Sequence, residues 1–104
     1  MKSLLVIGAI AFVASVGEVF GDVRVGEAYV KDAALEMKCG TEVIKARTDS
    51  TGSYRLSAKT SGKCSISVTH EGQSPTVEVV VFEKPTRYRL VLEKKGDTWT
   101  LRRV

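Results

Sequence analysis

Short runs in which apolar and polar side chains alternate dominate the chain after residue 22, and they constrain its fold more than any other feature. The cleanest run is 64–68, where Cys64, Ile66 and Val68 alternate with serines, and similar runs cover 34–39, 54–57, 87–93 and 98–102. No window there shows a convincing 3.6-residue period. A period of two places side chains on opposite faces of a strand. The pattern therefore predicts an all-β chain.

Residues typical of turns separate these runs. In the segment 49–52, Asp49 can accept hydrogen bonds from its own backbone, and Gly52 can supply the positive φ that closes a hairpin. Seven or eight short strands with such turns predict an antiparallel β-sandwich. The run Val77–Phe82 is nearly all apolar, so we expect that strand to be covered on both faces. The predicted core includes Leu56, Ile66, Val79, Leu90 and Trp99.

The N-terminus is typical of a secretory signal peptide. Lys2 precedes an apolar run from Leu4 to Val16, which is shorter than the roughly 20 residues that a membrane-spanning helix needs. Small residues suit cleavage after Gly17 or after Gly21. We therefore expect a signal peptide over residues 1–21, a single domain over 22–104 with no transmembrane segment, and a secreted or periplasmic location. An uncleaved N-terminal anchor is the alternative.

The two cysteines, Cys39 and Cys64, each lie on the apolar phase of their runs. Both side chains should therefore point into one core, and disulfides persist in the compartments that exported chains enter. We predict a Cys39–Cys64 disulfide, with two buried reduced thiols as the alternative. Two cysteines and one distant histidine do not make a zinc site, so no metal is expected.

Basic residues crowd the last quarter of a chain whose formal net charge is +4. On the alternation, Arg87 and Arg89 share one outward face, and Arg102 can lie near them. Such a face suits an acidic polymer, anionic lipid headgroups or an acidic protein. Nucleic acid is not expected, because exposed aromatic residues are not interleaved with the charges. The alternative is ordinary charge at strand edges, which prevents aggregation.

Catalytic signals are weak. His70 is the single histidine, and no GxSxG nucleophile setting accompanies it. Nucleotide-binding glycine motifs are absent, and the segment 49–52 lacks the carboxylate series of an EF-hand calcium loop. We therefore expect no catalytic residue and no cofactor. A small secreted hydrolase that uses His70, or a protease inhibitor that exposes the loop Glu71–Thr76, is the alternative function.

Three segments together resemble a known family. They are Ala33–Met37, the hairpin Ala46–Leu56 with its T-D-x-x-G-x-Y pattern, and the strand Gly62–Val68. Over roughly residues 23–92 the chain resembles the carboxypeptidase regulatory-like domain, and it is less closely similar to the Ole e 1-type domain. The resemblance implies a transthyretin-like or immunoglobulin-like sandwich. It also implies a non-catalytic module of a kind found beside peptidases, outer-membrane receptors and glycan-binding proteins. Together with the alternation and the signal segment, it leads us to expect a secreted binding or structural module that contacts an extracellular protein, a carbohydrate or an anionic surface.

Overall fold

The computed structural model describes residues 17–104, so the apolar run of the predicted signal peptide lies outside the described residues. Within 17–104 there is no helix long and apolar enough to cross a membrane. These residues form nine strands: β1 (Gly17–Val25), β2 (Ala28–Tyr29), β3 (Ala34–Cys39), β4 (Glu42–Arg47), β5 (Ser53–Ala58), β6 (Gly62–Val68), β7 (Thr76–Val81), β8 (Thr86–Lys95) and β9 (Thr98–Arg103).

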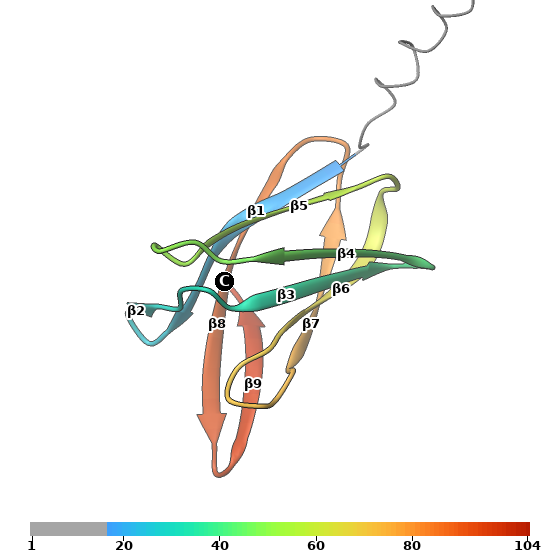
Figure 1. The fold of residues 1–104 in the computed structure, drawn as a ribbon. Helices are drawn as coiled ribbons and strands as arrows, with labels where there is room; N and C mark the ends of the chain where they lie inside the picture. The colour runs from blue at the N-terminus through green and yellow to red at the C-terminus, as the bar shows by residue number, and fades with distance from the viewer. Residues whose placement is uncertain (1–16) are drawn as a thin grey trace, which may run out of the picture.

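The strands form two sheets that pack face to face as a β-sandwich (Figure 1). Sheet A has the order β2-β1-β8-β9, with β5 pairing the first part of β1. Sheet B has the order β4-β3-β6-β7. β4 lies beside β5 at one border of the sandwich, and β7 lies beside β9 at the other. The all-β sandwich that the alternation predicts is confirmed.

β1 differs from the sequence-based prediction in two ways. Its pairing with β8 is parallel, whereas the other strand pairs of the described residues are antiparallel. It also begins at Gly17, so residues 17–21, which we assigned to the signal peptide, form half of a strand. Val19 is fully buried there between β5 and β8. Cleavage after Gly21 would remove this side chain from the core, whereas cleavage after Gly17 would leave it in place.

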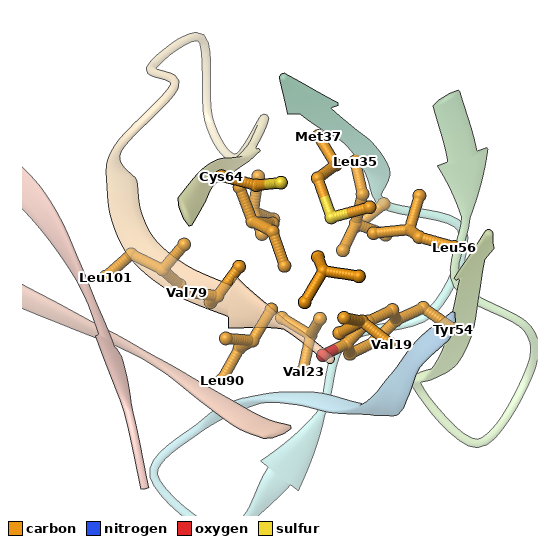
Figure 2. Packing of buried hydrophobic residues seen from close by; sticks show 14 of the residues in the cluster. Val19, Val23, Leu35, Met37, Tyr54, Leu56, Cys64, Val79, Leu90 and Leu101 are labelled. Atoms are coloured by element: carbon orange, nitrogen blue, oxygen red, sulfur yellow. The ribbon is translucent and has the colours of Figure 1, made fainter. Parts of the chain in front are cut away.

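The core lies between the two sheets and is formed by the apolar phase of each strand (Figure 2). Leu56, Ile66, Val79, Leu90 and Trp99 are all buried, so the predicted core residues are confirmed. Figure 2 shows Val19 and Val23 of sheet A facing Leu35 and Met37 of sheet B. Burial of these aliphatic side chains is the main stabilising contribution to a domain of this size.

Two further expectations about sheet B were wrong or incomplete. Val77–Phe82 is not covered on both faces: β7 is a border strand, Val79 and Val81 are buried, and Phe82 is 52% exposed. β4 was missed because Val43 and Ile44 are adjacent and blur the alternation, although Ile44 and Ala46 do pack against the core.

The predicted disulfide between Cys39 and Cys64 is confirmed, with their Cα atoms 4.5 Å apart. It joins the end of β3 to β6, next to the cross-strand pair Lys38 and Ser65. Both cysteines are buried, as the alternation predicts. The bond therefore links two central strands of sheet B.

Candidate functional site

The outer face of sheet A carries the most distinctive group of side chains in residues 17–104. Val19 and Val23 of β1 and Leu90 of β8 point into the core. Because side chains alternate along a strand, the residues between them point outward. We call this surface the arginine face; its arginines are Arg24, Arg55, Arg87, Arg89 and Arg102.

Strand register arranges these side chains in rows across the sheet. The first row runs Arg55, Phe20 and Arg87 over β5, β1 and β8. The second places Asp22 beside Arg89. A third row, listed in order across β2, β1, β8 and β9, contains Tyr29, Arg24, Val91 and Arg102.

Asp22 is the centre of the arginine face. Its residue is only 7% exposed, and its Oδ1 lies 3.6 Å from Arg24 Nε and 3.5 Å from Arg89 Nε. Its Oδ2 lies 3.9 Å from Arg87 Nη2. Oδ1 and both Nε atoms are buried, and none of the three makes a hydrogen bond within the described residues. Three guanidinium groups therefore share one carboxylate, which leaves the centre of the face positively charged.

The two outer arginines each have an acidic neighbour. Arg55 Nη1 donates a hydrogen bond of 3.1 Å to Glu18, and Arg102 Nη2 donates one of 3.1 Å to Glu93. The Arg102 guanidinium lowers the pKa of the Glu93 carboxyl, mainly through this hydrogen bond. Balanced pairs at the rim thus surround a centre with excess positive charge.

Two hollows meet at Arg87. One, of about 560 Å³, is lined by Phe20, Gly21 and Asp22 of β1, by residues of β5 that include Arg55, and by Arg47 and Asp49. The other, of about 190 Å³, is lined by Arg87, Arg89 and Val104. An anionic group in either hollow would contact guanidinium groups.

The structure places the predicted basic residues as follows. Arg87 and Arg89 both lie at Asp22, whereas Arg102 lies on the same face but pairs with Glu93. Asp22, Arg24 and Arg55 were not predicted from the sequence. Asp22 and Arg24 alternate with Val19, Val23 and Val25, a signal that becomes visible only when the strand is taken to begin near Gly17.

Asp49 and Gly52 form the turn between β4 and β5. Asp49 Oδ1 accepts hydrogen bonds from the backbone N–H groups of Thr51 and Ser53 and from the Thr51 hydroxyl, each 2.9 Å long. These bonds lower the pKa of the Asp49 carboxyl, with the Ser53 N–H making the largest contribution. Gly52 has a φ of 73°, which a glycine adopts without strain.

His70 contacts Trp99 on β9 and the loop after β6, and not the arginine face. Its ring packs edge-on against Trp99 at a centroid distance of 4.6 Å, and its Nε2 lies 3.8 Å from a Glu71 oxygen. Trp99 Nε1 donates a hydrogen bond to Glu71, and the Trp99 backbone N–H donates one to Gln73. The loop that joins β6 to β7 is therefore fastened to the β8–β9 hairpin.

A scan against protein-family models finds no match for this chain, and a search of curated proteins finds none similar to it in sequence. The functional interpretation therefore depends on the geometry. Its main features are the buried Asp22, the three arginines around it and the two hollows beside Arg87.

Proposed function

We propose that this protein is an exported, non-catalytic binding module that holds an anionic ligand on the arginine face. The observation that carries the proposal is the sharing of the Asp22 carboxylate by Arg24, Arg87 and Arg89. A single carboxylate balances a single guanidinium, so this cluster attracts further negative charge. Arg87 is the most available of the three, because its side chain is 60% exposed.

The basic residues around Asp22 are arginines, which favours a ligand held in a defined orientation. A guanidinium offers a planar set of donors that pairs with carboxylate, sulfate or phosphate through two parallel hydrogen bonds. The Nε atoms of Arg24 and Arg89 face Asp22, so the carboxylate orients both side chains before any ligand arrives. Such preorganisation reduces the entropy that binding would otherwise lose.

The environment of His70 supports a non-catalytic role. A general base needs a cleft in which a substrate can reach it. His70 instead packs against Trp99 and lines none of the described hollows that flank the arginine face. The loop Glu71–Thr76, considered as an inhibitory loop, uses Glu71 and Gln73 to hold Trp99.

Two observations support export. The N-terminal sequence is typical of a signal peptide. The Cys39–Cys64 disulfide is of a kind that persists in oxidising compartments. β1 requires Val19, which favours cleavage after Gly17 over cleavage after Gly21. The likeness to the carboxypeptidase regulatory-like domain, a non-catalytic module, is consistent with the same proposal.

The test compares two double variants, each of which removes two positive charges from the outer face of one sheet. We expect the purified protein to be retained on immobilised dextran sulfate and on poly-L-glutamate, and to elute as salt rises above about 0.15 M. The double variant Arg87→Gln/Arg89→Gln should bind at least tenfold more weakly, because hydrogen bonds to charged groups contribute about 1.5–3 kcal/mol each.

The matched control is Lys38→Gln/Lys45→Gln, which removes the same charge from the outer face of sheet B. It should change the affinity less than threefold, since exposed charges act weakly and through screened fields. The proposal fails if neither polymer is retained at low salt, or if the two double variants lose affinity equally.

A further inference from the structure

Phe20 is the one aromatic side chain within the first row of the arginine face, between Arg55 on β5 and Arg87 on β8. It is half-buried and lines the larger hollow. The Arg55 guanidinium lies over the face of its ring, 5.9 Å from the centroid. Arg55 therefore covers one side of the ring, and the ring also borders the hollow that it shares with Arg87.

An aromatic face beside cationic groups suits a sugar that carries an acidic substituent. The face of an aromatic ring is electronegative and attracts the weakly positive C–H groups on one side of a sugar ring. Arg87 can then pair with a carboxylate or sulfate on the same sugar, because Phe20 and Arg87 are register neighbours and line the same hollow. The hollow, at about 560 Å³, falls within the range of sites for small molecules.

The distribution of charge favours an extended ligand over a single anion. The arginines of the face occupy β5, β1, β8 and β9, which are neighbouring strands. Strands lie about 4.8 Å apart, so Arg55 and Arg87 are separated by about 10 Å across β1. A linear polymer with repeated charges can contact several of these positions at once.

The face is less suited to a folded protein or a membrane. Acidic side chains are depleted at the buried centre of protein interfaces, whereas the centre here is Asp22 with its arginines. The large exposed apolar side chains of residues 17–104 do not gather at one place: Val43 and Phe82 belong to sheet B or follow it, whereas Tyr29 and Val104 lie at the margins of the arginine face. A membrane surface would require apolar groups that project together.

We infer that the anionic ligand is an acidic polysaccharide, one sugar ring of which rests on Phe20 while its acidic group pairs with Arg87. This inference rests on the proposed function and narrows it to one class of ligand. Arg89, whose side chain is 38% exposed, contacts the next acidic group along the polymer, and Asp22 holds it in position.

The experiment compares two polymers that carry the same charged group. Affinity for polygalacturonate and for poly-L-glutamate is measured at equal carboxylate concentration and ionic strength, with vesicles of anionic phospholipid as a third probe. We expect polygalacturonate to bind at least fivefold more tightly than the other two. Phe20→Leu should reduce polygalacturonate affinity roughly fivefold, as expected for a lost aromatic contact, and leave poly-L-glutamate binding unchanged.

The matched control is Phe82→Leu, which alters an exposed phenylalanine outside the arginine face. It should leave both affinities unchanged, and circular dichroism should show that both variants are folded. Equal binding of the two polymers through Arg87 and Arg89 would overturn the polysaccharide inference and preserve the proposed function. Tighter binding to vesicles would overturn it in favour of a membrane. Loss of every interaction would overturn both.

Discussion

The outer faces of the two sheets carry similar numbers of basic residues but organise them differently. On sheet B the basic residues are Lys38, Lys45, Arg47 and Lys63. Lys38 Nζ lies 3.8 Å from Glu36 Oε1; the Lys38 side chain is exposed and that of Glu36 is partly buried. On sheet A, arginines surround Asp22, whose side chain is 10% exposed. A buried carboxylate, and not the number of positive charges, distinguishes the two faces.

The hollows lead to the same conclusion. A larger hollow, about 730 Å³, lies over sheet B and is lined mostly by small or hydroxylated residues such as Ala34, Ser67 and Thr69. Its charged lining residues are Glu36, Lys38, Lys45 and Arg47. The carboxylates that pair with Lys38 and Arg47 belong to Glu36 and Asp32, and neither is buried. The smaller hollows beside Arg87 adjoin guanidinium groups that are already oriented. Size alone therefore does not identify the site.

The largest expected effect is the loss of stability caused by Gly21→Ala, which alters the packing beneath the arginine face. A Cβ atom at Gly21 would clash with the backbone oxygen of Tyr88, and the Tyr54 hydroxyl donates a hydrogen bond to the same oxygen. The parallel pairing of β1 and β8 must therefore separate locally. We expect a loss of about 3 kcal/mol or more in the free energy of unfolding, measured by urea denaturation.

Ser57→Ala on the neighbouring strand β5 is the control for Gly21→Ala. Its side chain is exposed, so the change should stay within about 0.5 kcal/mol. A Gly21→Ala protein as stable as the wild type would show that β1 and β8 do not approach as closely as the structure indicates.

Removal of the disulfide, which lies in sheet B, should lower the free energy of unfolding by a similar amount. The bond closes a loop with a sequence separation of 25 residues, so Cys39→Ala/Cys64→Ala should lower the free energy of unfolding by about 3 kcal/mol. Because the bond lies in sheet B, polyanion affinity of the folded variant should be unchanged. A loss of affinity under strongly native conditions would contradict the assignment of binding to sheet A.

Asp22→Asn should have an intermediate effect on polyanion affinity. Net charge and side-chain positioning predict changes of opposite sign. The substitution removes a negative charge from the arginine face, so net charge alone predicts tighter polyanion binding. If Asp22 positions Arg24 and Arg89, affinity should instead fall about fivefold, with a loss of about 1–2 kcal/mol in stability. Glu36→Gln on sheet B is the control and should alter neither quantity appreciably. Tighter binding by Asp22→Asn would mean that charge matters and geometry does not.

The smallest expected effect is on how the stability of the folded protein falls with decreasing pH. The pKa values of Asp49 and Glu93 are lowered in the folded state from ordinary values of 3.8 and 4.5, by hydrogen bonds from the Ser53 N–H and from Arg102 respectively. Their contributions are therefore complete above the ordinary values and are lost as the pH falls through the lowered ones. Thermal unfolding between about pH 2 and 5 should show a shallower acid decline for Asp49→Asn and Glu93→Gln than for the wild type.

High salt should distinguish the contribution of Asp49 from that of Glu93. The Asp49 bonds to backbone N–H groups form within a turn and should persist in salt, whereas the exposed pair Glu93–Arg102 on sheet A is screened. An equal response of both variants to salt would contradict this difference.

Much of the fold could be predicted because strand alternation is a local property. Ile66 and Leu90 were placed in the core from the phase of their own strands, and two cysteines of matching phase allowed a single intramolecular pair. β4 and the one-sided burial of β7 were not predicted, because adjacent apolar residues hide the phase. The candidate site could be predicted only in part, since Arg87 and Arg89 stand on one strand while their shared carboxylate stands on another.

The amino-acid pattern alone specifies which side chains point inward on most strands, which turns join them, and that the chain is all-β. The position of β1 between β5 and β8, with Asp22 opposite Arg89 and Phe20 between Arg55 and Arg87, follows only from the packing of the two sheets. The physical reason is that the direction of a side chain depends on its immediate neighbours in the strand. The choice of neighbouring strand depends on how both sheets bury their apolar faces together.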